Sequence, residues 1–107
     1  METIEAKSGT WVGHLCRKIP RHLDFYKVGL KPSDIGSVWT FHSPKNKSES
    51  VGYVYRVVVA SETEPYRSVR YGFYHEQTGL SKPDTISRKK AIANLISVAT
   101  EWDDGRD

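Results

Sequence analysis

The chain has 107 residues, of which 37% are apolar and 27% are charged, and its formal net charge is +3. This composition is typical of one globular domain and excludes a largely disordered chain. Its one cysteine, Cys16, excludes an intramolecular disulfide and favours a reducing, cytoplasmic location. Because no apolar stretch approaches the roughly 18 residues that cross a membrane, we expect no membrane partner.

The N-terminal third predicts one strand between two less regular segments. Residues 1–9 are mostly polar and are typical of a flexible N-terminal arm. Apolar side chains alternate over residues 10–19, which indicates a strand that ends before Pro20. Residues 21–36 contain glycine and proline turn signals and predict no long element.

Three further strands are predicted at residues 37–42, 51–61 and 67–76. The strand at 51–61 is apolar on both faces, which favours a central position in the sheet. Its short connection to the strand at 67–76 predicts an antiparallel hairpin. Residues 77–84 then predict a loop.

The clearest element is a helix over about residues 86–102, which Thr85 or Ser87 can cap. Its apolar side chains recur at helical spacing and define one buried stripe: Ile92, Leu95, Ile96, Ala99 and Trp102. Together the elements predict an α+β fold, with a three- to four-stranded antiparallel sheet and a C-terminal amphipathic helix packed on one face. The domain organisation is then an arm at 1–9, a single α+β domain at 10–102 and an acidic tail at 103–107. The other face of the sheet is left to solvent or to a ligand, and an open sheet edge can pair with a second copy as a homodimer.

Charge is distributed unevenly along the chain. Residues 1–100 hold 15 of the 16 basic residues and 9 of the 13 acidic residues, a net charge of +6. Arg88, Lys89 and Lys90 fall in the first helical turn, where the helix dipole disfavours cations unless an external anion offsets them. The alternative is a solvated helix end that tolerates a small cost. Cations beside first-turn amides favour phosphate binding, and the candidate contacts are Lys82, Arg88, Lys89, Lys90, Lys45 and Lys47.

The order of strands and helix over residues 37–100 resembles the C-terminal half of double-stranded RNA-binding domains. The motif match is at residues 87–91, Ser-Arg-Lys-Lys-Ala, which is similar to the Ser-Lys-Lys-x-Ala-type helix start of that family. In the family this helix start binds phosphates across the RNA groove. The resemblance implies that Arg88 and Lys89 contact phosphates and that Ala91 is a small packing residue.

Tyrosine and arginine residues gather on the predicted hairpin. These side chains are common anchors of protein interfaces, and they also stack the bases of single strands. Cross-strand packing within the core is the alternative. The candidate interface residues are Arg70, Tyr74, Arg56 and Tyr66.

Catalytic and metal-binding patterns are missing from the sequence. The four histidines and Cys16 show no zinc-ligand spacing and no nucleophile–base pattern. Metal-free phosphodiester chemistry would need two histidines close together, such as His42 and His75. We therefore predict a small non-catalytic nucleic-acid-binding module with no cofactor or metal. The alternative is a small protein-binding inhibitor or adaptor, such as a phage or mobile element encodes against a host nucleic-acid or defence enzyme.

Overall fold

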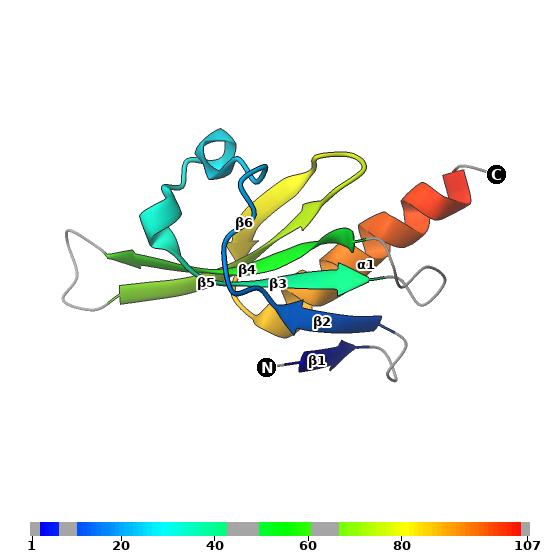
Figure 1. Ribbon diagram of the computed structural model, residues 1–107, viewed down its shortest axis with the longest axis horizontal. Coiled ribbons are helices and arrows are strands. Elements are labelled where there is room, and N and C mark those ends of the chain that lie inside the picture. The colour runs from blue at the N-terminus through cyan, green and yellow to red at the C-terminus, as the bar shows by residue number, and fades with distance from the viewer. Residues whose placement is uncertain (1–2, 7–10, 43–49, 61–66, 106–107) are drawn as a thin grey trace.

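The computed structural model describes residues 3–6, 11–42, 50–60 and 67–105 (Figure 1). Its strands are β1 (Thr3–Ala6), β2 (Trp11–Leu15), β3 (Ile35–His42), β4 (Ser50–Ala60), β5 (Arg67–His75) and β6 (Ser81–Thr85). Each strand pairs antiparallel with the next one in the chain, which gives one six-stranded sheet in sequence order. The helix α1 (Arg88–Gly105) follows, and two 3-10 helices, η1 (Phe25–Val28) and η2 (Pro32–Asp34), lie between β2 and β3. The predicted α+β class with an antiparallel sheet and a C-terminal helix is confirmed.

The predicted count of three to four strands is too low, because two short edge strands were missed. The segment 1–9, expected as a flexible arm, contains β1, which pairs with β2. The segment 77–84, expected as a loop, contains most of β6, which pairs with β5. Neither segment has the apolar alternation that identifies a strand in the sequence. Both instead pair with the unpaired backbone N–H and C=O groups that a sheet edge offers.

Helix α1 packs on one side of the sheet and forms the larger core. Its buried side chains Ala91, Ile92, Leu95, Ile96 and Ala99 pack on Trp11, Trp39, Phe41, Val54 and Phe73 of the strands. The predicted stripe is confirmed except at Trp102, which is 37% exposed and contacts His75 edge-on at the stripe's end. The helix begins at Arg88 rather than 86 and continues to Gly105, so the predicted acidic tail starts inside it.

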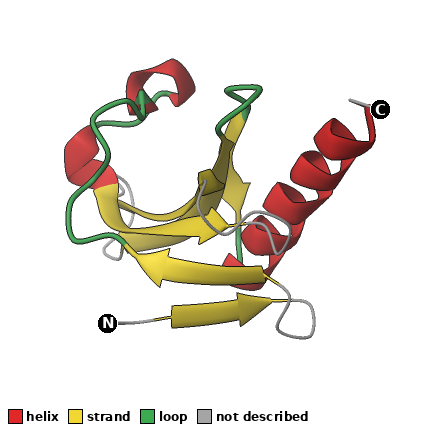
Figure 2. Ribbon diagram, turned by 45° about the vertical axis from the view of Figure 1, so that its right-hand side comes forward, coloured by secondary structure: helices red, strands yellow, loops and turns green. Residues whose placement is uncertain are grey.

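The second side of the sheet is covered by the connection between β2 and β3, so the expectation of an open face is wrong (Figure 2). Leu23 and Phe25 of this connection pack against side chains of β3 and β4, namely Ile35, Val38, Tyr53, Tyr55 and Val57. Asp24 begins η1, where its carboxylate accepts from the Tyr26 amide at 3.1 Å. Two buried side chains without periodic spacing are too few for a sequence pattern to reveal this cover.

Candidate binding surfaces

The three cations Arg88, Lys89 and Lys90 occupy the first turn of α1, which contains no acidic residue. Ser87 precedes them as the N-cap, because its Oγ accepts from the Lys90 amide at 3.1 Å and its carbonyl accepts from the Ala91 amide at 3.1 Å. Ser87 therefore caps the helix, as one of the two predicted candidates. A helix leaves its first amides without acceptors of its own, and Ser87 supplies one for the Lys90 amide.

Arg88 differs from the two lysines that follow it. Its guanidinium lies 5.4 Å from the ring centroid of Trp39, a buried residue of β3, and its side chain is half-buried. Lys89 and Lys90 are exposed. A cation over an indole face is attracted by the ring quadrupole, so Arg88 anchors the helix start on the sheet. The lysines are the side chains that extend toward solvent.

Lys82 lies on β6, exposed, opposite Phe73 of β5. Directly opposed residues of antiparallel strands project to the same side, and Phe73 belongs to the core beneath α1. Lys82 therefore projects to the side of the sheet that carries the helix start. Within the described part of the chain, no carboxylate lies within ion-pair distance of Lys82, Lys89 or Lys90. The candidates Lys45 and Lys47 lie outside the described residues.

The four candidate interface residues do not form one surface. Arg70 is opposite Val57, and Tyr74 is opposite Tyr53, so both project to the side covered by the connection. Arg56 alternates with these β4 positions and projects to the helix side. Tyr66 lies outside the described residues.

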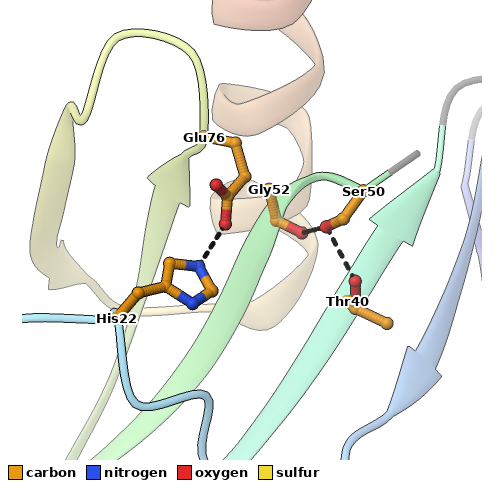
Figure 3. A network of polar contacts seen from close by, with 5 residues as sticks. All are labelled: His22, Thr40, Ser50, Gly52 and Glu76. Carbon is orange, nitrogen blue, oxygen red and sulfur yellow. Dashed lines mark hydrogen bonds and ion pairs between the residues drawn. The ribbon is translucent and has the colours of Figure 1, made fainter.

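Sequence reasoning missed a polar hollow on the connection side of the sheet. The hollow has a volume of about 450 Å³ and is lined by His22, Ser50, Tyr53, Glu76 and Gln77. His22 comes from the connection and contacts the carboxylate of Glu76, which follows β5 (Figure 3). The two residues are 54 positions apart in the chain, so no local spacing could have indicated the pair.

Aromatic rings surround His22. The centroid of its ring lies 5.6 Å from that of Tyr53 and 6.4 Å from that of Tyr74, both in edge-to-face geometry. The centroids of the two tyrosine rings lie 6.3 Å apart. Burial is the largest cause that raises the pKa of Tyr53, and the negative charge and hydrogen bonding of Glu76 raise it further, against a hydrogen bond with Ser50 that lowers it. The Tyr53 hydroxyl therefore stays protonated as a hydrogen-bond donor.

Ser50 fixes the wall of the hollow. Its Oγ lies 2.9 Å from Thr40 Oγ1 and donates to the Gly52 carbonyl at 3.4 Å (Figure 3). These contacts join β3 to the start of β4. Ser50 and Tyr53 of the sheet thus line the hollow from one side, whereas His22 lines it from the connection.

The other three histidines do not line this hollow. His42 contacts His14, with ring centroids 6.1 Å apart. His75 is buried, contacts Thr78 at 2.8 Å and lies edge-on to Trp102. Cys16 is half-buried, and burial raises the pKa of its thiol. Among the described residues there is no group of three or more His, Cys, Asp or Glu that suits a metal ion.

No protein-family model, curated protein or solved structure matches this chain significantly. Over the described residues, no helix is long and apolar enough to cross a membrane. Functional conclusions therefore depend on the chain's own surfaces.

Proposed function

We propose that this protein is a non-catalytic nucleic-acid-binding module that contacts phosphates with the start of α1 and with Lys82. The observation that carries the proposal is a first helical turn made entirely of cations, with Lys89 and Lys90 exposed. Cations at a helix N-terminus cost roughly 0.3–1 kcal/mol each, and a bound phosphate would offset that cost by meeting both the side chains and the helix amides. The resemblance of residues 87–91 to the RNA-binding helix start supports the same choice.

The alternative role, a protein-binding inhibitor or adaptor, has less support from the geometry. Of its four candidate residues, Arg70 and Tyr74 project to the connection side of the sheet, whereas Arg56 projects to the helix side. The fourth, Tyr66, lies outside the described residues. The cations of the helix start and Lys82 instead share one side. Phosphate contact is therefore the function that we test first.

The test compares two double variants with the same change of net charge. Lys89→Glu/Lys90→Glu alters the helix start, whereas Lys18→Glu/Lys31→Glu alters two exposed lysines of the connection on the other side. Fluorescence anisotropy with duplex RNA, duplex DNA, single strands and heparin over a salt series measures binding. We expect wild-type binding to weaken steeply with salt, because each phosphate contact contributes roughly 0.9 to the slope of log K against log salt. The helix-start variant should lower that slope by about 2.

Urea unfolding distinguishes a variant that has lost binding from a variant that has lost its fold. Replacing cations by acids at a helix N-terminus stabilises the helix by roughly 0.3–1 kcal/mol per residue, so Lys89→Glu/Lys90→Glu should unfold at a higher urea concentration than wild type. The proposal is wrong if wild type binds none of the polyanions at low salt. It is equally wrong if the helix-start and connection variants bind alike.

A further inference from the structure

The hollow on the connection side already holds a planar N–H donor, the side chain of His22. The imidazole contacts the Glu76 carboxylate (Figure 3). It also lies against the rings of Tyr53 and Tyr74. One carboxylate and two aromatic rings are the groups that recognise an organic cation in proteins. His22 thus contacts the same kinds of group that hold an organic cation.

The groups that hold His22 are more firmly placed than His22 itself. Tyr53 is 8% exposed and is paired with Tyr74 across β4 and β5. Glu76 continues that pairing, because its amide donates to the Val51 carbonyl at 3.0 Å. His22 lies in a turn of the connection, with 51% of its side chain exposed. An external group can therefore replace His22 without disturbing the sheet.

The charge of the hollow is opposite to that of the chain. Among the described residues that line the hollow, Glu76 is the only Asp, Glu, Lys or Arg, whereas the whole chain carries +3. Burial is the larger cause of the raised pKa of Tyr53, and the charge of Glu76 raises it further. A cation is thus favoured here and an anion is disfavoured.

We propose that Tyr53, Tyr74 and Glu76 form a binding site for a planar organic cation, specifically a guanidinium group, and that the side chain of His22 is its internal competitor. A guanidinium matches the carboxylate with two parallel N–H donors and stacks on aromatic rings, as an ammonium does not. The hollow beside Glu76 and Tyr53 is open to solvent, and Tyr74 lines the adjoining hollow, so the remainder of a larger ligand can extend outward. This site is on the other side of the sheet from the helix start and does not depend on phosphate binding.

The test removes the competitor and adds the cation. Methylguanidinium is titrated into wild type and into His22→Ala, and amide chemical shifts by NMR report the site and the dissociation constant. If His22 occupies the site for about nine-tenths of the time, its removal should tighten binding about tenfold. His22→Ser is a second variant that opens the same site. Methylurea, which has the same planar shape without the charge, should bind neither variant measurably.

Glu76→Gln in the His22→Ala background provides the decisive control, because it keeps the shape of the site and removes its charge. We expect this double variant to lose methylguanidinium binding. Free agmatine and an arginine-containing tripeptide, titrated in parallel, distinguish a small-molecule ligand from the arginine of a polypeptide. The proposal is overturned if His22→Ala and His22→Ser bind no tighter than wild type, if methylurea binds equally, or if Glu76→Gln leaves binding unchanged. Lys89→Glu/Lys90→Glu should bind methylguanidinium as wild type does, so each proposal can fail alone.

Discussion

The two sides of the sheet are covered in different ways. On one side, α1 contributes five buried side chains at regular spacing and satisfies most of its own backbone hydrogen bonds. On the other side, the connection contributes Leu23 and Phe25, and its backbone is held by single turn bonds such as Leu30 N–H to the Phe25 carbonyl at 3.0 Å. The helix is a continuous cover, whereas the connection touches the sheet at a few points.

This difference explains where the polar groups are. Among the described residues, the side chains that form the core beneath α1 are all apolar. The connection leaves a hollow of about 450 Å³ and an adjoining one of about 300 Å³, and His22 lines both. The helix side therefore holds the larger apolar core, and the connection side carries the two hollows.

The largest expected effect compares one leucine from each cover. Leu95→Ala should destabilise the protein by about 4 kcal/mol, because Leu95 is fully buried under continuous packing that cannot collapse into the cavity. Leu23→Ala should cost only about 2 kcal/mol, since the connection can move toward the sheet and fill the space. Urea unfolding measures both. Equal losses for the two variants would show that the connection is packed as firmly as the helix.

A second, smaller effect is expected from a contact that both sides of the sheet share, in which an aromatic ring packs against a glycine of the neighbouring strand. Gly13 lies opposite Phe41 on the helix side, and Gly72 lies opposite Tyr55 on the connection side. A Cβ on either glycine would approach the facing ring to 2.5 Å, so alanine at each position should cost roughly 1–3 kcal/mol by overpacking. Gly72→Ala should cost more, because the Tyr55 hydroxyl lies 2.8 Å from Ser81 Oγ and restrains the ring.

Gly36→Ala is the matched control for these two variants. A Cβ at Gly36 meets its nearest neighbour, Val58, at 3.7 Å, which is an ordinary contact. We expect a change of less than about 0.5 kcal/mol in the free energy of unfolding. If Gly13→Ala and Gly72→Ala are as mild as this control, ring stacking on glycine does not contribute to either side.

The sequence predicted the helix side much better than the connection side, for a physical reason. The apolar residues from Ile92 to Ala99 repeat at helical spacing because one regular element buries them all. Strands β2 to β5 were found because each has apolar side chains buried on at least one side. The edge strands β1 and β6 form by backbone pairing, which leaves no pattern of side chains to read.

The candidate sites follow the same division. The cations of the helix start were found because a first turn can be located from its cap and its periodicity, and Ser87 is that cap. The contact of Arg88 with Trp39 and the meeting of His22 with Glu76 depend on tertiary packing. No spacing within the chain indicates either contact, so only the folded structure reveals them.

The smallest expected effect is a loss of stability at alkaline pH that comes from the connection side. Burial raises the pKa of Cys16 above its ordinary value of 9.0 and that of Tyr53 above 10.0. In the unfolded chain both groups ionise at their ordinary values, whereas the folded protein keeps them protonated longer. The free energy of unfolding is therefore not reduced by these two groups below about pH 9. It decreases as the pH rises through 9 and 10 toward their pKa values in the folded protein.

Urea unfolding of wild type, Cys16→Ser and Tyr53→Phe at pH 7, 9 and 10.5 measures this loss. Cys16→Ser should remove the part that begins near pH 9, because a serine hydroxyl does not ionise in this range. Tyr53→Phe should remove the part of the loss that begins near pH 10, because phenylalanine has no hydroxyl to ionise. This variant keeps the ring that contacts His22. If all three proteins lose stability equally between pH 7 and 10.5, alkaline sensitivity comes from other groups. A common loss of that kind would show that the connection leaves Cys16 and Tyr53 as open to water as the unfolded chain does, which would remove the contrast with the continuous cover of α1.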